Sequence, residues 1–223
     1  MKEVPIYEIK EDIALRYAPL ADSIRQKMKE KHTYLLNVMS SPGSGKTTLL
    51  ISLINKLKKD YRIAVIETDI DGREDAQRIY DNTGVKTIQI HTGGACHLTS
   101  QMSEEALKII DTDPLDLIFI ENIGNLVCPA EFDVGAIKNL VLLSLPEGDD
   151  KPLKYPLMFE VAHVVAITKV DTQPIFDFNV ETAIKNIKFR NPNVDIFVTS
   201  AKKDIGVDDL ANYLKKEVEG FIR

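Results

Sequence analysis

The stretch SSPGSGKTTLL, residues 40–50, decides the fold. It follows a short apolar run and leads into an amphipathic segment, which is the strand–loop–helix order of a phosphate-binding loop. Gly45, Lys46 and Thr47 fit the pattern G-x4-G-K-[ST], whereas Ser40 stands where the pattern begins with glycine. The remaining glycines still let the backbone approach a phosphate group closely, so a nucleotide-binding loop is predicted.

Each residue type in this loop is expected to contact a different part of the nucleotide or its metal ion. The curled backbone points its N–H groups at phosphate oxygens, and the next helix presents its positive N-terminus to them. Lys46 is expected to reach the β- and γ-phosphates, and the Thr47 hydroxyl to ligate Mg²⁺. A glycine-rich turn without a nucleotide is the alternative. The expected nucleotide contacts of the loop are Gly43, Ser44, Gly45, Lys46, Thr47 and Thr48.

Short apolar runs rich in valine and isoleucine alternate with charged amphipathic stretches along the chain. Near-continuous apolar strands separated by helices predict a parallel sheet that helices cover on both faces. We therefore expect an α/β fold of the P-loop NTPase type, with a mostly parallel sheet of about seven strands. The predicted strands are residues 34–40, 62–69, 85–92, 116–123, 139–145, 163–171 and 194–201.

The first 31 residues are predicted to form a helical arm ahead of the nucleotide-binding domain, residues 32–223. Pro19 is expected to break or begin this helix, because proline disrupts a helix interior. The arm is expected to pack on the main domain, with docking of a partner as the alternative. Apolar residues along one helical face are Ile13, Tyr17, Leu20, Ile24 and Met28.

The overall composition excludes several classes of protein. The chain has 223 residues, is 44% hydrophobic and carries a net charge of −6, which suits one globular domain and argues against bulk binding to nucleic acid. It has no apolar run long enough to cross a bilayer and no signal-peptide pattern, so a cytoplasmic protein is expected. Its two cysteines are then free thiols or metal ligands.

The run DLIFIENIGN, residues 116–125, is predicted to be a buried strand that ends in an acidic residue. Glu121 and Gly124 resemble the D-x-x-G element of GTPases, with glutamate in place of aspartate. A carboxylate at the carboxyl end of such a strand can hold Mg²⁺, and the Gly124 N–H can sense the γ-phosphate. An ordinary strand-terminal acid is the alternative.

A second acidic group lies in ETDIDGREDAQR, residues 67–78. Its aspartates cluster where a switch loop would approach the γ-phosphate. Asp69 is favoured for Mg²⁺, and Asp75 or Asp71 for orienting the attacking water. A solvated acidic turn is the alternative. The predicted catalytic residues are Lys46, Asp69, Asp71, Asp75 and Glu121.

Two further elements favour guanine over adenine. AITKVD, residues 166–171, resembles the N-K-x-D element of GTPases with Thr168 at the asparagine position, and VTSAKKD, residues 198–204, matches their S-A-K loop. The Asp171 carboxylate can accept hydrogen bonds from guanine N1–H and N2–H, which adenine does not offer. GTP and GDP are therefore the expected ligands, and residues 32–223 a GTPase domain. The expected base contacts are Lys169, Asp171, Ser200, Ala201 and Lys202.

The only two cysteines raise the possibility of a transition-metal site. Cys96 and His97 follow the third predicted strand, and Cys128 lies four residues after Gly124, so both segments open on one side of the sheet. Thiolates and imidazole suit Ni²⁺ or Zn²⁺. Three ligands do not close a tetrahedral structural site, although a symmetric dimer could pool the ligands of two chains. A buried thiol beside a chance neighbour is the alternative.

Taken together, five motifs resemble the HypB family of hydrogenase nickel-incorporation GTPases, which is related to the urease accessory GTPase. They are SSPGSGKTTLL, the acidic ETD turn, HTGGACHL, ENIGNLVCP and the TKVD–SAK pair, and the similarity spans roughly residues 34–215. The resemblance implies the P-loop fold of signal-recognition GTPases, MinD and BioD, a homodimer that forms on GTP or is stabilised by metal, and slow hydrolysis of GTP. It also implies that Cys96, His97 and Cys128 are the metal ligands.

The resemblance further implies a role in [NiFe] hydrogenase maturation. Members of the family help to deliver Ni²⁺ to the hydrogenase large-subunit precursor, together with a small zinc-containing chaperone of the HypA type. Many carry a Cys-rich or His-rich nickel-storage segment, whereas residues 1–31 contain neither residue type, so we expect no such storage there. The alternatives are a urease-type nickel accessory GTPase, or a P-loop ATPase or kinase with structural cysteines. Ser41 stands where a MinD-like loop has lysine.

Overall fold

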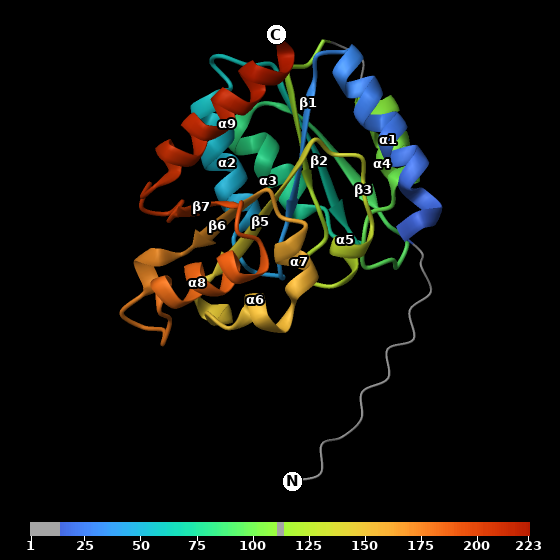
Figure 1. Cartoon of the computed structure of the whole chain (residues 1–223). Coiled ribbons are helices and arrows are strands. Elements are labelled where there is room, and N and C mark those ends of the chain that lie inside the picture. The colour runs from blue at the N-terminus through green and yellow to red at the C-terminus, as the bar shows by residue number, and fades with distance from the viewer. Residues whose placement is uncertain (1–13, 111–113) are drawn as a thin grey trace.

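A seven-stranded sheet forms the centre of the molecule (Figure 1). The computed structural model describes residues 14–110 and 114–223. All strand pairs are parallel, in the order β3-β2-β4-β1-β5-β6-β7, which confirms the predicted α/β class. The strands are β1 (Tyr34–Met39), β2 (Ile63–Asp69), β3 (Lys86–His91), β4 (Leu117–Glu121), β5 (Lys138–Ser144), β6 (Val164–Thr168) and β7 (Asp195–Val198).

Helices pack on both faces of this sheet (Figure 1). One layer contains α2, α3 and α9, and the other contains α1 and α4 beside α7 and α8. The helices are α1 (Ala14–Glu30), α2 (Lys46–Leu57), α3 (Glu74–Thr83), α4 (Ser100–Ile110), α5 (Cys128–Glu131), α6 (Lys151–Lys154), α7 (Pro156–Glu160), α8 (Val180–Arg190) and α9 (Val207–Ile222), with 3-10 turns at Leu145–Glu147 and Val170–Thr172.

The central strand β1 is buried on both faces. Leu36 and Val38 pack into the core under α2 and α9, whereas Leu35 and Met39 point to the opposite layer. Successive side chains of a strand alternate between faces, so a strand covered by helices on both sides is nearly continuously apolar, and β1 departs from this only at the buried Asn37. The phosphate loop therefore follows directly from the centre of the core.

The strand order reverses around β1, which pairs with β4 on one side and β5 on the other. In an open parallel sheet such a reversal leaves a crevice at the carboxyl ends of the strands, where ligands bind. The loops after β1, β2, β4, β6 and β7 all open at this end. They carry the nucleotide-binding motifs predicted above.

The N-terminal helix differs from expectation at Pro19. We predicted that Pro19 would begin or break the helix, but it lies inside α1. Proline there gives up one backbone hydrogen bond. Ile24 and Met28, further along the helix, are buried in the core beside Leu107 of α4, and such packing stabilises a helix more than local propensity does. The helix packs on the main domain as expected (Figure 1).

Residue Ile13 and the rest of the arm up to that point lie outside the described residues. The division at residues 31 and 32 stays a prediction, as does partner docking by the arm. Within the described ranges, no helix combines the length and the apolar character needed to span a membrane.

Candidate functional site

The phosphate loop between β1 and α2 adopts the expected curl. Gly43 and Gly45 have φ angles of 71° and 97°, a region that favours glycine. The buried Ser40 hydroxyl accepts hydrogen bonds from Lys46 Nζ at 3.1 Å and from the Ser44 hydroxyl. Ser40, where the pattern has glycine, thus makes contacts inside the loop. Burial lowers the pKa of Lys46, so a phosphate anion beside its ammonium would stabilise the charge.

Three carboxylates meet beside this loop, on β2, α3 and β4. Oxygens of Glu67, Asp75 and Glu121 all lie within 4.8 Å of one another. The Thr47 hydroxyl donates to Glu121 Oε1 at 2.7 Å. Glu67 and Glu121 are only 3% and 2% exposed, and the Oε2 atom of each has no hydrogen-bond partner. Both line a cavity of about 310 Å³ that also contains Lys46.

These buried, unpartnered oxygens fit a hard divalent cation such as Mg²⁺, which prefers oxygen ligands. Burial, and next the charge of Glu121, raise the pKa of Glu67 to about 8. Burial raises the pKa of Glu121 to about 7, against the hydrogen bond from Thr47. A cation between the two carboxylates would offset the repulsion between the negative charges of Glu67 and Glu121.

Glu67 was missed by the sequence interpretation, which considered the aspartates that follow it. Its signal was an acid directly after the apolar run of residues 63–66 and still inside the strand. Glu67 stands directly opposite Glu121 in the register of β2 and β4, which only the sheet topology reveals. Asp69 lines the same cavity, but its Oδ1 accepts the N–H groups of Asp71 (3.0 Å) and Gly72 (2.7 Å), which lower its pKa. Asp71 does not line that cavity.

A rise in pH is expected to destabilise the metal-free protein through Glu67. Its folded pKa of about 8 lies above the ordinary value of 4.5. Between these values the folded chain keeps a proton that the unfolded chain has lost, so stability falls as pH rises. The Glu67→Gln variant does not lose stability in this way. Relative to wild type, its melting temperature should therefore rise by about 2–4 °C or more as the pH is raised from about 5 to about 8.

Calorimetry in the presence of EDTA measures this difference. The exposed Glu105→Gln is measured alongside as the matched control. A Glu67→Gln offset from wild type that is independent of pH would show that Glu67 does not titrate as described.

The two base-reading elements lie side by side. The Ser200 hydroxyl donates to Asp171 Oδ1 at 2.5 Å. Both segments line a cavity of about 220 Å³, which shares Gly45, Thr48 and Lys169 with the cavity beside the carboxylates. The two cavities therefore form one crevice along the phosphate loop. The base-side cavity also contains Ser44, Asp171, Ser200, Ala201 and Lys202.

Two hydrogen bonds join the base-reading loop to the phosphate loop. The Thr168 hydroxyl donates to the Ser44 carbonyl at 2.8 Å, and Lys169 Nζ donates to the Gly43 carbonyl at 2.6 Å. Thr168 stands where GTPases have asparagine, and its hydroxyl supplies a contact between the two loops. A larger cavity, of about 800 Å³, lies away from this crevice and is lined by Phe132 and other residues.

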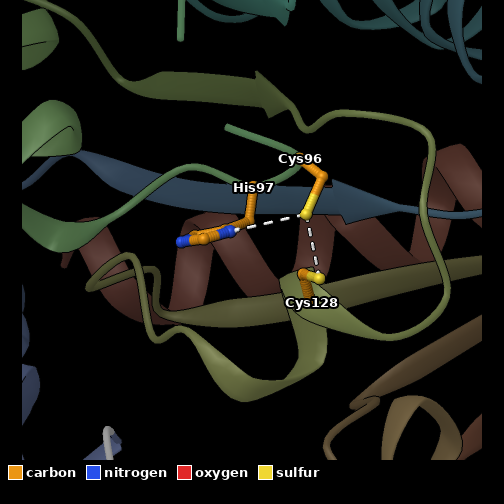
Figure 2. A group of neighbouring side chains, drawn as sticks. All are labelled: Cys96, His97 and Cys128. Carbon is orange, nitrogen blue, oxygen red and sulfur yellow. Dashed lines mark hydrogen bonds between the residues drawn. The ribbon is translucent and has the colours of Figure 1, made fainter. Parts of the chain in front are cut away.

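The two cysteines and His97 converge from two segments of the chain (Figure 2). Cys96 and His97 lie in the loop after β3, and Cys128 is the first residue of α5. The two Sγ atoms are 3.0 Å apart, and Cys96 Sγ lies 3.9 Å from His97 Nδ1. Both cysteines are free and partly exposed. Two thiols and an imidazole at this spacing can share one borderline or soft metal ion.

Neighbouring groups orient this cluster. The His97 ring stacks on Phe132, with centroids 3.6 Å apart and an interplanar angle of 20°. The hydrogen bond with Cys96, followed by burial, raises the pKa of the Cys128 thiol. Burial lowers the pKa of His97, which favours the neutral imidazole that a metal ion requires.

Comparison with known proteins places the chain among nucleotide-binding maturation factors. The family model described as CobW/HypB/UreG, nucleotide-binding domain, matches residues 34–197. The hydrogenase/urease maturation factor HypB of Helicobacter hepaticus is 45% identical over 201 residues, covering 88% of this chain and 82% of that protein. The chain belongs to the HypB family. Its resemblance to HypB, inferred above from five motifs, is thereby confirmed.

Other members of the HypB family agree in sequence and in fold. The hydrogenase maturation factor HypB of Escherichia coli K12 is 41% identical over 217 residues, which cover 97% of this chain and 74% of that protein. The crystal structure of Helicobacter pylori HypB in complex with nickel has a TM-score of 0.87 and 39% identity, over 93% of this chain and 97% of that one. Both the sheet and the nucleotide-binding loop thus belong to the HypB fold.

Proposed function

We propose that this chain binds and hydrolyses GTP and uses the nucleotide cycle to deliver Ni²⁺ for hydrogenase maturation. The observation that carries the proposal is a thiol–imidazole cluster on the same side of the sheet as a crevice lined by the phosphate loop and the base-reading elements. The name of the Escherichia coli relative, hydrogenase maturation factor, and the nickel complex of the Helicobacter pylori relative support it. The proposed partners are a second copy of the chain, a zinc-containing chaperone of the HypA type and the hydrogenase large-subunit precursor, in the cytoplasm.

The nucleotide reaction is hydrolysis of GTP to GDP and phosphate. The oxygen of a water molecule forms a bond to the γ-phosphorus, the bond from that phosphorus to the bridging oxygen breaks, and the water proton passes to the phosphate product. Lys46 stabilises charge on the transferred phosphoryl group, and Asp75 orients the water. Thr47, Glu121 and Glu67 would hold Mg²⁺, which would supply positive charge beside the β- and γ-phosphates.

The nickel ion is the cargo of this cycle. Cys96, His97 and Cys128 provide three donor atoms from one chain. A partner or a second copy can supply a further ligand, and such sharing allows the ion to pass from one protein to another. Zn²⁺ suits the same donors, so it is the proposed competitor for the site.

Replacing Asp171 by alanine is expected to weaken GTP binding about 100-fold and to abolish the preference for GTP over ATP, because a charged acceptor of two base hydrogen bonds is lost. Displacement of a fluorescent guanine nucleotide by GTP and ATP measures both effects. The exposed Asp177→Ala is the control. Retained affinity and preference in Asp171→Ala would refute guanine recognition by this residue.

Nickel supply to urease is a second candidate function, because the Helicobacter hepaticus relative is a hydrogenase/urease maturation factor. The two functions are distinguished by incubating the nickel-loaded chain and GTP with a hydrogenase large-subunit precursor or with nickel-free urease, and measuring the activation of each. Activation of the hydrogenase that requires both Ni²⁺ and GTP hydrolysis supports the proposal. Activation that is equally fast without GTP would contradict it.

A further inference from the structure

The loop between β4 and α5, residues 122–127, lies between the phosphate loop and the cysteine cluster. Its backbone is pressed onto the phosphate loop, since a Cβ atom at Gly124 would lie 2.8 Å from Pro42 Cα. The next residue, Asn125, donates its N–H to the Ser40 carbonyl at 2.8 Å. Gly124 and Asn125 are therefore held directly against the phosphate loop.

The side chain of Asn125 reaches the other way, to both cysteine-bearing segments. Its Nδ2 donates to the Cys96 carbonyl at 3.4 Å, and the amide also hydrogen-bonds the Cys128 thiol. Its Oδ1 accepts the Val127 N–H at 2.8 Å, which fixes the turn that leads to Cys128. One residue thus contacts the phosphate loop through its backbone and both cysteine-bearing segments through its amide.

We propose that Asn125 is the positioning residue that makes nickel affinity depend on the bound nucleotide. This inference rests on the proposed function, in which Ni²⁺ binds the cluster and GTP or GDP binds the crevice. The γ-phosphate changes the contacts of the phosphate loop and of Gly124, and Asn125 passes the displacement to the segments that carry the two sulfurs. Small displacements suffice, because metal–sulfur bonding depends steeply on distance and direction.

Another connection runs between the neighbouring strands, where the Thr92 N–H donates to the Asp69 carbonyl at 3.1 Å. It links the acidic turn to the start of the loop that carries Cys96 and His97. This contact does not involve the segment of Cys128. Asn125 contacts both segments, so its amide can change the distance between the two thiols.

The test measures Ni²⁺ affinity by competition with a chromophoric chelator, with GDP or a non-hydrolysable GTP analogue bound. In the wild-type chain the two dissociation constants should differ about 5- to 150-fold. In Asn125→Ala they should agree within about twofold, while both nucleotides still bind. By reciprocity, the effect of Ni²⁺ on nucleotide affinity should vanish as well.

Two more variants separate positioning from folding. Asn125→Asp keeps the acceptor for the Val127 N–H but loses the donor to the Cys96 carbonyl, so it should lose the nucleotide dependence while the turn is retained. Val127→Ala changes an exposed side chain of the same loop and should keep the dependence. Unfolding of Asn125→Ala would be seen by circular dichroism, and Asn125→Asp then decides the question.

The outcomes distinguish the inference from the function on which it rests. If the wild-type dissociation constants are equal with both nucleotides, coupling of nucleotide and nickel is absent and the proposed cycle fails, together with this inference. If the wild type shows the difference and Asn125→Asp keeps it in full, the proposed cycle stands and the role of Asn125 is overturned.

Discussion

Replacing Lys46 by alanine is expected to lower kcat/KM for GTP hydrolysis by about 10³-fold or more. The Lys46 ammonium group lies inside the phosphate loop, where it donates a hydrogen bond to the Ser40 hydroxyl at 3.1 Å. Catalysis of phosphoryl transfer depends on charges that are positioned before the reaction, so loss of this half-buried cation at the phosphates is costly. Phosphate release under steady-state conditions measures the effect.

Lys59→Ala is the matched control, because Lys59 is exposed near the end of α2. It should hydrolyse GTP at the wild-type rate. A Lys46→Ala chain that keeps kcat/KM within about tenfold of wild type would show that the lysine does not act on the transferred phosphoryl group.

Replacing Cys96 or Cys128 by alanine is expected to weaken Ni²⁺ binding by about 10²-fold or more. Four-ligand thiolate and imidazole sites bind Zn²⁺ with about 10–16 kcal/mol, so one ligand contributes several kcal/mol. The two sulfurs are 3.0 Å apart, and neither replacement touches the nucleotide crevice. Chelator competition gives the affinity, and elemental analysis gives the metal content of each variant.

His97→Ala should lose nickel affinity too, whereas His32→Asn should not, because His32 is exposed and asparagine tolerates its positive φ. Nucleotide affinity is expected to persist in all the variants. Unchanged nickel content in Cys96→Ala, Cys128→Ala and His97→Ala alike would refute the cluster as the nickel site.

The sheet could be predicted from the sequence because its central strands are apolar runs buried on both faces, whereas the edge strands β3 and β7 are only partly buried and were recognised from their isoleucine and valine residues. Six of the seven predicted runs contain an observed strand, and the remaining run, 139–145, is shifted by one residue from β5 (Lys138–Ser144). Pro19 was predicted wrongly because its effect on the helix depends on distant packing, by Ile24 and Met28, which local propensity does not encode.

The site was only partly predictable. Motifs with fixed spacing identified the phosphate loop and the base-reading loops, since their chemistry is local. Glu67 became visible only through the β2–β4 register, and Asn125 only through hydrogen bonds that join segments far apart in the chain. Residues that act through neighbours in space leave little trace in a single sequence.

The fastening of Thr168 to Ser44 and of Lys169 to Gly43 has a consequence for the kinetics of nucleotide exchange. These two hydrogen bonds join the loop that would contact the base to the loop that would contact the phosphates, so an incoming nucleotide does not have to order one loop against the other. Preorganisation of this kind saves the entropy of ordering loops. We therefore expect guanine nucleotides to associate in one kinetic phase, with a modest change in heat capacity.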